Sequence, residues 1–463
     1  MRKLVLAVIA LLLLSCVVSQ AAPTQTIAVP TAIPPTQTTA VQSATPPGQP
    51  PALPTATPPA AKPTATNNAG ITFSVGPDEA LTYPSELITL PDEHTTFMPP
   101  AAGSDSYLVF AATFRQTGSP VVLETKDLRS FGLAPGYAQP VMSPPLRFTV
   151  CKPSYDPEFD LNYAAPGSVL QDPTRPAGNL MMMIYEAENH CPGAVWQVQF
   201  YVTVGFARSA DYGKTWPAAV DSELGGADRY PVLKGSVPEP ATPEQPPVAL
   251  GDALPSAFVD GTALYVVYTV SAPGGDGLIR VARATLGGSG AVSLLKWNNG
   301  TFSGAGIGGP DSAVLPARGC MGYQLTGSIS YSDALGVYLM TFVCVSSKKD
   351  SNGTPQPNQG AWYFSTATRL DQQNWSAPRM IENSQFPVTT GCGLSGSGRS
   401  FDGWYPSFMS PGAPSGHLGA AGSVFFMNGC DLGKRVFVGR TFTIRGAEGD
   451  LRPSSTDITD GKP

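Results

Sequence analysis

Ala263-Leu-Tyr-Val-Val-Tyr268 is an apolar and aromatic run that follows a turn at Gly261 and precedes a polar loop. Four other stretches repeat the arrangement, namely Tyr107-Leu-Val-Phe-Ala-Ala112, Leu180-Met-Met-Met-Ile-Tyr185, Val337-Tyr-Leu-Met-Thr-Phe342 and Ser423-Val-Phe-Phe-Met427. They recur at intervals of roughly 75 to 85 residues, which suits one four-stranded propeller blade with long loops. The recurrence predicts an all-β chain folded as a single β-propeller with five blades.

The composition also favours strands over helices. The chain of 463 residues contains 49 glycines and 48 prolines, and no apolar pattern of period 3.6 lasts for three turns between them. Short β-branched and aromatic runs bounded by turn residues are typical of sandwiches, barrels and propellers. We expect the propeller to occupy residues 69–446. A sixth blade built from 195–250 is the alternative, because long Pro-rich insertions blur the repeat there.

The N-terminus has the pattern of an export signal. Two basic residues precede the apolar run 4–14, which is too short to span a bilayer but has the length of a signal-peptide core. The run ends in Leu13-Leu-Ser-Cys16, which resembles a bacterial lipobox. We therefore predict a signal peptide over 1–15 and acylation of Cys16, which would hold the protein on the extracellular face of the membrane. Ordinary cleavage near Ala21, giving a secreted protein, is the alternative.

Residues 16–68 are expected to form a disordered tether behind the lipidated cysteine. They are mainly Pro, Thr, Ala and Gln, with Lys62 as the only charge, and they contain no periodic apolar pattern to bury. Residues 447–463 are predicted to be a flexible tail. The net charge is −6 and no Lys/Arg cluster is present, which argues against nucleic acid as a partner. The expected partners are a lipid bilayer and a carbohydrate or glycoconjugate.

Six of the seven cysteines remain once Cys16 is assigned to the lipid, and an even number in an exported chain predicts disulfides. The count alone leaves 15 pairings open. In the propeller interpretation, three cysteines precede an innermost strand and three follow the second strand of the same blade. Those two positions are neighbours at one end of a blade. The predicted pairs are Cys151–Cys191, Cys320–Cys344 and Cys392–Cys430.

Ser209-Ala-Asp-Tyr-Gly-Lys-Thr-Trp216 is the sharpest local motif, and it resembles the Asp box, Ser-x-Asp-x-Gly-x-Thr-Trp, of sialidases and other propellers. The residues predict a hairpin turn. The carboxylate of Asp211 can accept backbone N–H bonds, Gly213 can adopt a positive φ, and Trp216 can pack on the blade. We expect a structural role, so Asp211 is a poor catalytic candidate.

The rhythm of the strands, the Asp box and the phrases Ala164-Ala-Pro-Gly-Ser168 and Trp404-Tyr-Pro-Ser-Phe408 together resemble the five-bladed propeller glycosidases of the arabinanase, β-xylosidase and fructosidase group. The resemblance implies carboxylates at the starts of the first three innermost strands. The first of these strands begins with Glu93-His-Thr-Thr96. The second and third read Ala-Pro-Gly167 and Leu254-Pro-Ser-Ala257, so the triad of that group is not matched there.

Other carboxylates are expected at the same end of the propeller. Glycoside hydrolysis needs two carboxyl groups, about 5 to 5.5 Å apart for retention or about 6.5 to 9.5 Å apart for inversion. Glu186 directly follows an apolar strand, and Asp160 or Asp402 could face it across the channel. The expected catalytic residues are Glu186, Asp160 and Asp402, and the expected substrate-binding residues are Glu188, His190, Tyr163, Asp252, Trp404 and Arg399.

No cofactor is expected, because neither the histidines nor the cysteines have zinc spacing. Calcium is the alternative, since Asp156-x-Glu-x-Asp-x-Asn162 is an alternating run of oxygen ligands, although it lacks a glycine at the sharp turn. We therefore expect an exported, membrane-anchored propeller that binds extracellular carbohydrate. If it is an enzyme, it would hydrolyse the glycosidic bonds of that carbohydrate. The alternatives are a non-catalytic propeller for adhesion or assembly, and a sialidase-like exoglycosidase using Arg115, Arg318 and Arg399.

Overall fold

The computed structural model describes residues 70–446, with gaps at 88–89, 102–103, 114–118, 143–158, 161, 175–179, 191–199, 217–219, 222–225, 228, 236–248, 272–275, 288–290, 317–319, 321, 350–354, 391–398, 402 and 430–434. These residues all belong to the larger of two units, Lys62–Pro463. The signal peptide, the tether and the tail lie outside them, so their boundaries stay predictions. No described residue belongs to a helix that could cross a membrane.

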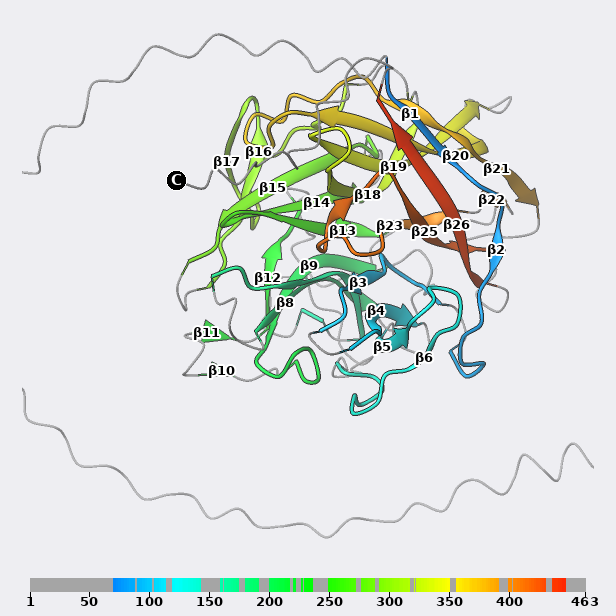
Figure 1. The fold of residues 1–463 in the computed structure, drawn as a ribbon. Coiled ribbons are helices and arrows are strands. Elements are labelled where there is room, and N and C mark those ends of the chain that lie inside the picture. The colour runs from blue at the N-terminus through cyan, green and yellow to red at the C-terminus, as the bar shows by residue number, and fades with distance from the viewer. Residues whose placement is uncertain are drawn as a thin grey trace, which may run out of the picture. The chain divides into compact units, whose positions relative to one another are not determined.

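The described residues form an all-β propeller of five antiparallel blades (Figure 1). The first blade contains β3 (Thr96–Met98), β4 (Tyr107–Thr113), β5 (Ser119–Thr125) and β6 (Gly132–Leu133). The second contains β7 (Tyr163–Gln171), β8 (Met181–His190), β9 (Phe200–Ser209) and β12 (Arg229–Leu233). The third contains β13 (Leu250–Asp260), β14 (Ala263–Ser271), β15 (Ile279–Thr285), β16 (Leu295–Asn298) and β17 (Thr301–Ala305).

The fourth blade contains β18 (Tyr323–Ser332), β19 (Val337–Lys349), β20 (Pro355–Ala367), β21 (Arg379–Thr390) and β22 (Arg399–Phe401). The fifth contains β23 (Trp404–Met409), β25 (Ala421–Asn428), β26 (Val436–Arg445) and β1 (Thr72–Val75). The short strands are β2 (Glu79–Ala80), β10 (Val220–Asp221), β11 (Gly226–Ala227) and β24 (His417–Leu418). Because β1 pairs with β26, a strand from the start of the described chain completes the last blade. The described part of 195–250 completes the second blade, so it builds no sixth.

Five hydrophobic clusters lie between successive blades, and they explain why the second strands are continuous apolar runs. In β8, Met183 and Tyr185 face the first blade, whereas Met182 and Ile184 face the third. In β14, alternate residues likewise pack on the second and the fourth blade. A strand buried on both faces reads as a run of apolar residues rather than as an alternation. The repeat that predicted the blades is therefore the signature of this double burial.

A ring of hydroxyl groups ties the innermost strands together around the axis. Each hydroxyl bonds the backbone of the next inner strand. The contacts are Thr95 N–H to Ser407 Oγ (2.8 Å), Val169 N–H to Thr96 Oγ1 (3.0 Å), Ala257 N–H to Ser168 Oγ (2.8 Å) and Ser256 Oγ–H to the carbonyl of Gly327 (2.6 Å). They join the inner strands β23, β3, β7, β13 and β18 in that order. The expected toroid with an axial channel is confirmed.

Four of the five inner strands contain a β-bulge next to this hydroxyl ring. Register shifts occur at Pro166/Ser168, Ala253/Ser256, Leu325/Ser328 and Trp404/Ser407, one in each inner strand except β3. Three of them hold a non-glycine residue at positive φ, namely Leu254 (54°), Thr326 (48°) and Tyr405 (56°). A bulge re-aims the backbone of the strand that carries it, and bulges are frequent beside active sites. Here the bulge of β13 leaves the N–H of Leu254 free to bond a side chain of the second blade.

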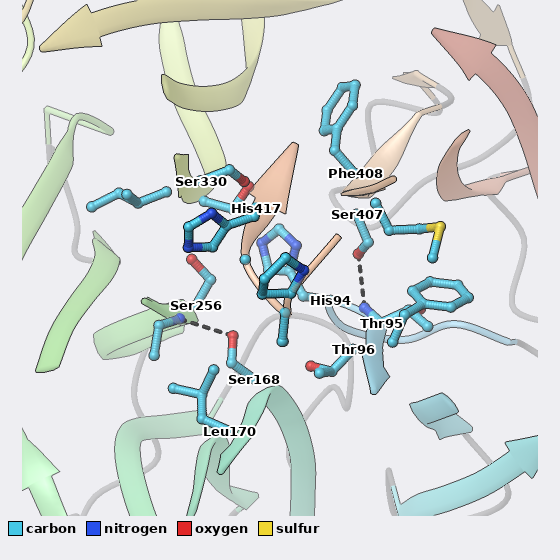
Figure 2. A pocket seen from close by; sticks show the side chains of 18 of the residues that line it. His94, Thr95, Thr96, Ser168, Leu170, Ser256, Ser330, Ser407, Phe408 and His417 are labelled. Atoms are coloured by element: carbon cyan, nitrogen blue, oxygen red, sulfur yellow. Dashed lines mark hydrogen bonds between the residues drawn. The ribbon is translucent and has the colours of Figure 1, made fainter. Parts of the chain in front are cut away.

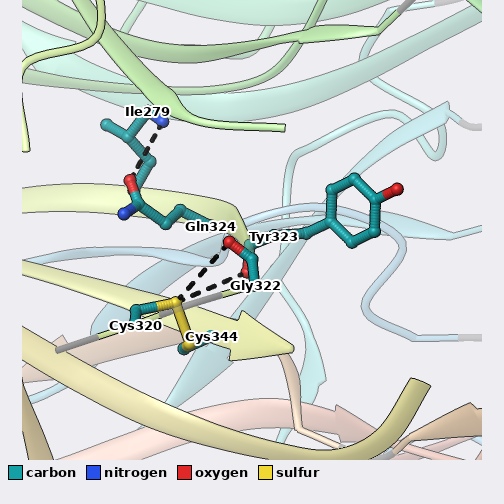
Figure 3. Close-up of a disulfide and its surroundings, with 6 residues drawn as sticks. All are labelled: Ile279, Cys320, Gly322, Tyr323, Gln324 and Cys344. Carbon is teal, nitrogen blue, oxygen red and sulfur yellow. Dashed lines mark hydrogen bonds between the residues drawn. A yellow bond between two sulfur atoms is a disulfide. The ribbon is translucent and has the colours of Figure 1, made fainter. Parts of the chain in front are cut away.

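The disulfide Cys320–Cys344 is present, as predicted, with a Cα–Cα distance of 5.9 Å (Figure 3). It joins the segment just before β18 to the strand β19 of the same blade, where Gln324 and Cys344 are paired in register. With a sequence separation of 24 between the half-cystines, such a bridge stabilises a fold by about 3 kcal/mol in the chain-entropy model. The other five cysteines, Cys16, Cys151, Cys191, Cys392 and Cys430, lie outside the described residues, so their roles stay predictions.

The Asp-box turn is built by its own side chains. Asp211 accepts bonds from the N–H of Thr215 (2.9 Å) and from the hydroxyl of Ser209 (2.7 Å). Gly213 has a φ of 80°. Trp216 is buried, and its Nε1–H donates to the carbonyl of Gly213 (3.1 Å). The motif therefore shapes an outer turn of the second blade and contributes no group to the axis.

Candidate functional site

Four buried carboxyl groups converge at one end of the axial channel. Asp92 and Glu93 precede the innermost strand of the first blade, and Glu186 and Glu188 come from β8 in the second. We call these four residues the carboxylate cluster. They lie at the end where the inner strand β7 begins, because Tyr163 and Glu188 are paired in register. The hydroxyl of Tyr163 crosses to the first blade and donates to Asp92 Oδ2 (3.0 Å).

The pleat of β8 places Glu186, Glu188 and His190 on one face of the strand, because side chains alternate with period two. The sequence predicted that Glu186 opens a loop. That prediction was wrong, since β8 continues to His190 and all three side chains are buried. The longer strand has a clear consequence. Paired on both sides, by β7 and β9, it holds the three polar side chains rigidly against the axis.

A chain of hydrogen bonds runs along this face of β8. The N–H of Leu254, freed by the bulge in β13, donates to Glu186 Oε2. Glu186 is in turn hydrogen-bonded to Glu188. Glu188 Oε2 contacts Nε2 of His190. Three side chains in series, with one backbone donor at the end, form a path along which a proton can move between two carboxyl groups and an imidazole.

Burial decides the charge state of this chain. It raises the pKa of Glu188 to about 8 and lowers the pKa of His190 to about 3. At neutral pH both groups are therefore uncharged, and their contact is a hydrogen bond between neutral partners rather than an ion pair. Burial and the adjacent Glu188 also raise the pKa of Glu186 well above its usual range. The face of β8 thus stores protons at a pH at which exposed glutamates have lost theirs.

Glu93 differs from the other members of the cluster. It is fully buried, yet neither oxygen has a hydrogen-bond partner among the residues that the structure describes. Burial raises its pKa well above the usual range, and the nearby Glu186, Asp92 and Glu188 raise it further. The adjacent N–H of His94 lowers the pKa somewhat without reaching either oxygen in hydrogen-bond geometry. A buried carboxyl without partners is costly to the fold, and such groups are enriched where a ligand supplies the missing partner.

Asp92 is the member of the cluster that has a cationic partner. Arg435, from the fifth blade, contacts its Oδ1 through Nη1, and both side chains are buried. Burial raises the pKa of Asp92, whereas Arg435 and the hydroxyl of Tyr163 lower it. Of the four carboxyl groups, Asp92 is therefore the one best able to stay ionised. Sequence reasoning missed it together with Arg435, because 343 residues separate the two and no local pattern links them.

His94 marks the boundary between the cluster and a cavity of about 90 Å³ along the axis (Figure 2). Its ring is buried, its pKa is lowered to about 4 by burial, and its Nε2 has no partner among the described residues. The cavity is lined by hydroxyl groups such as Ser256 and Ser407 and by the ring of His417, and its described lining includes no Asp, Glu, Lys or Arg. The channel therefore changes from acidic at one end to hydroxyl-rich beyond the hydroxyl ring.

The remaining predicted site residues lie elsewhere or outside the described part. Asp160 is bonded to Arg229 (2.5 Å) and to the hydroxyl of Tyr185 (3.2 Å), so the structure pairs Glu186 with Glu188 rather than with Asp160. Asp252 is fully buried against Lys296 (2.8 Å). Trp404 is half-buried beside Tyr405, at a centroid distance of 5.9 Å. Asp402 lies outside the described residues, as does the side chain of Arg399.

The described residues offer no metal centre. No group of three or more His, Cys, Asp or Glu side chains among them is arranged to hold an ion. Of the run predicted as a calcium alternative, Asp156 and Glu158 lie outside the described residues, and Asp160 is engaged by Arg229.

No family model matches the chain, and no curated protein matches it. Solved structures similar to it include the catalytic domain of a GH62 α-L-arabinofuranosidase from Coprinopsis cinerea, with 12% identity, TM-score 0.40 and coverage of 81% of this chain and 97% of that one. An N-acetylgalactosamine deacetylase from F. plautii has 11% identity, TM-score 0.43 and coverage of 81% and 96%. A family 117 glycoside hydrolase from Zobellia galactanivorans has 11% identity, TM-score 0.44 and coverage of 82% and 92%. At these identities and scores the similarities assign no activity.

Proposed function

We propose that the protein is an exported, membrane-anchored propeller that binds extracellular carbohydrate and hydrolyses its glycosidic bonds at the carboxylate cluster. The observation that supports this most is Glu93, a buried carboxyl group without a described partner, surrounded by Glu186, Glu188 and Asp92. Glycosidases need a carboxylic acid that keeps its proton near neutral pH and a second carboxyl that can carry charge. The carboxylate cluster contains both kinds of group. Burial and neighbouring carboxyls raise the pKa of Glu93, whereas Arg435 and Tyr163 help Asp92 to stay ionised.

The roles follow from those surroundings. No described residue bonds either oxygen of Glu93 in hydrogen-bond geometry, and burial and the neighbouring carboxyl groups raise its pKa more than the N–H of His94 lowers it. Glu93 therefore keeps its proton and acts as the general acid towards the leaving oxygen. Burial and Glu188 raise the pKa of Glu186, whereas the N–H of Leu254 lowers it by stabilising the anion. A positively charged sugar carbon beside Glu186 would favour the anion further, so we assign Glu186 as the carboxylate that stabilises, or attacks, that carbon. Each step uses groups already in contact or in electrostatic range.

The burial of the cluster favours a second candidate, a non-catalytic propeller for adhesion or assembly. Glu186 is 4% and Glu188 is 7% exposed, so a sugar could meet them only if this end of the channel opens. A propeller used only for binding would keep the carboxyl groups as a closed, structural cluster. The sialidase-like alternative needs Arg115 and Arg318, which lie outside the described residues, so it gains no support from the described site.

Hydrolysis of a panel of aryl glycosides by the full chain tests the proposal. Glu93→Gln is expected to lower kcat by about 10²- to 10⁴-fold on substrates with poor leaving groups, the usual contribution of a general acid. On dinitrophenyl glycosides, whose leaving group needs no proton, the loss should be much smaller. Glu186→Gln should lose activity on both kinds of substrate. This difference between the two variants identifies which carboxyl is the acid.

Glu382→Gln is the matched control, because Glu382 is an exposed glutamate on the outer strand β21 and should be without effect. Glycan-array binding by the same proteins separates the two candidates. Binding without turnover, unchanged in Glu93→Gln, would support the non-catalytic propeller. Neither turnover nor binding across both panels would contradict the proposed function altogether.

Anchoring is proposed from the N-terminal sequence alone and has its own test. The full-length chain, expressed in a bacterium that processes lipoproteins, should incorporate a labelled fatty acid and sediment with membranes. A Cys16→Ser variant should lose the label and appear in the soluble or secreted fraction. A wild-type chain that is released without label would contradict the anchor and support ordinary cleavage.

A further inference from the structure

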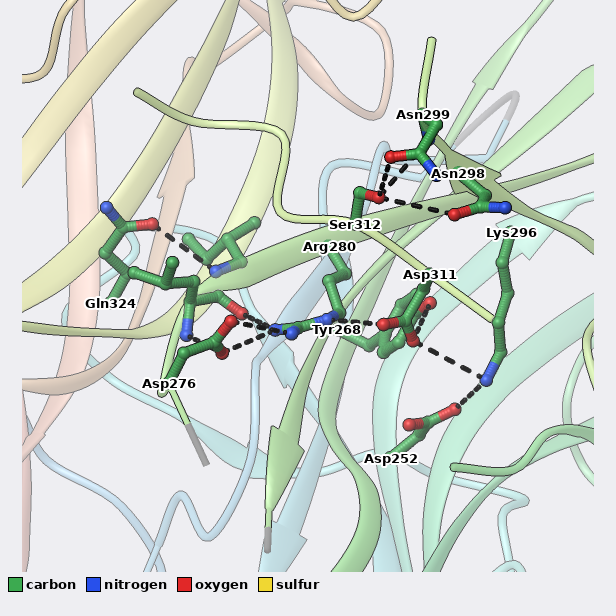
Figure 4. A network of polar contacts seen from close by, with 12 residues as sticks. Asp252, Tyr268, Asp276, Arg280, Lys296, Asn298, Asn299, Asp311, Ser312 and Gln324 are labelled. Atoms are coloured by element: carbon green, nitrogen blue, oxygen red, sulfur yellow. Dashed lines mark hydrogen bonds and ion pairs between the residues drawn. The ribbon is translucent and has the colours of Figure 1, made fainter. Parts of the chain in front are cut away.

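Lys296 is the most deeply buried cation among the described residues (Figure 4). It lies on β16, and its side chain has no exposed surface. The Nζ atom is 2.8 Å from Asp252 Oδ2 on β13, 2.6 Å from the carbonyl oxygen of Lys234 and 3.7 Å from Asp311 Oδ2. The ring of Tyr268 covers it, with its centroid 5.6 Å from Nζ. A primary amine is therefore held against a carboxyl group with water excluded.

The two aspartates beside Lys296 have different surroundings. Asp311 accepts Nε–H of Arg280 (2.8 Å) and the hydroxyl of Tyr268 (3.1 Å), so both of its oxygens are held in place. Asp252 is fully buried, and none of the described residues bonds its Oδ1. Burial raises the pKa of Asp252 to about 6, although Lys296 lowers it. Asp311 is thus positioned by two donors within reach of the amine, while Asp252 can take up a proton and become an electrophile.

We propose that Lys296 and Asp252 form an intramolecular isopeptide bond, with Asp311 as the base. The amine of Lys296, after giving a proton to Asp311, attacks the carboxyl carbon of protonated Asp252. The C–N bond forms and the C–OH bond breaks. Asp311 passes the first proton to the departing hydroxyl, which leaves as one molecule of water. Asp311 then takes the second proton from the nitrogen, so the products are a neutral amide, water and protonated Asp311. No oxidant, metal or second substrate is needed. The inference is independent of the proposed function, since these residues lie apart from the carboxylate cluster.

Geometry and shielding support the reaction. An amine nitrogen that is hydrogen-bonded to a carboxyl oxygen lies about 3 to 3.5 Å from the carboxyl carbon, the separation of a near-attack arrangement. The side chains of Lys296 and Asp252 have no exposed surface, which shields the amide from bulk water and raises the energy of the alternative, a buried ion pair. The bond would join β16, near the rim of the third blade, to its innermost strand β13.

Peptide mapping of the wild-type full chain tests the bond directly. After reduction and alkylation, trypsin cannot cleave at a modified Lys296, so residues 235–280 and 284–318 should appear as one joined species. Its mass should be the sum of the two peptides less one molecule of water, and fragmentation should place the link at Asp252 and Lys296. Recovery of 284–296 and 297–318 as separate, unmodified peptides would overturn the proposal.

Two variants define the chemistry. Asp311→Asn keeps the size of the base but cannot take the proton, so it should yield the separate peptides. Lys296→Arg keeps the cation but cannot form the amide, and it provides the reference mass map. If Asp311→Asn gave the joined species as fully as the wild-type chain, Asp311 would not be the base. The wild-type map requires no variant to fold, so the proposal can be decided on the natural chain.

Discussion

An Arg229→Met variant is expected to lose about 3 to 5 kcal/mol of unfolding free energy at pH 7, because it leaves Asp160 buried without its cation. Arg229 Nη2 lies 2.5 Å from Asp160 Oδ2, and both side chains are less than a tenth exposed. The hydroxyl of Tyr185 (3.2 Å) and the backbone N–H of Asp160 itself would remain as neutral donors to that carboxyl. Urea denaturation of the two proteins, compared through their midpoints at unchanged m-value, measures the loss.

Two further variants test whether the loss comes from the buried charge of Asp160 once its partner Arg229 is removed. The double variant Arg229→Met/Asp160→Leu replaces the pair by apolar side chains and should recover most of the stability. Arg369→Met breaks the exposed pair with Asp371, at 2.5 Å on the surface, and should have no measurable effect. Equal losses in Arg229→Met and Arg369→Met would show that burial does not govern these pairs. The expected result, a large loss in Arg229→Met that the double variant recovers, would show that Asp160, predicted as catalytic, contributes to stability.

The blade pattern could be predicted because its cause is local. Each second strand packs on two neighbouring blades, so its apolar character is written in consecutive residues such as Ala263–Tyr268. The stretches expected to open the first three innermost strands, at Thr96, at Gly167 and at Leu254–Ala257, fall in the observed inner strands β3, β7 and β13. The pairing of Cys320 with Cys344 followed from the same geometry. The burial of consecutive residues and the pairing of neighbouring antiparallel strands were enough to predict the blades and this disulfide.

The site was only partly predictable, because its contacts join distant segments. Glu186, Glu188 and His190 could be selected because they directly follow an apolar run, although the strand in fact continues through them to His190. The N–H of Leu254 reaches Glu186 only because of a bulge 68 residues further along the chain, and no sequence pattern announced it. Asp160 and Asp252 looked like free acids for the same reason. Their partners, Arg229 and Lys296, lie 69 and 44 residues away.

The opposite shifts of Glu188 and His190 give the fold a window of greatest stability. Glu188 keeps its proton in the folded state up to about pH 8 but releases it near 4.5 when unfolded, so its contribution is lost as pH rises through that range. His190 stays neutral down to about pH 3 but binds a proton near 6.5 when unfolded, so its contribution is lost as pH falls. Between about pH 4.5 and 6.5 the two slopes cancel, and above 6.5 only the loss from Glu188 remains.

Between pH 6.5 and 8 the wild-type protein is therefore expected to lose about 2 kcal/mol of unfolding free energy through Glu188, at about 1.4 kcal/mol for each pH unit. Glu188→Gln carries no charge at any pH, so its stability should fall less steeply over that interval. Glu93 and Glu186 shift in the same direction as Glu188 and keep a residual slope in both proteins. Urea midpoints measured at half-unit steps of pH give the two slopes. Parallel curves would mean that Glu188 is already ionised in the folded protein. The conclusion that this face of β8 keeps its protons at neutral pH would then be wrong.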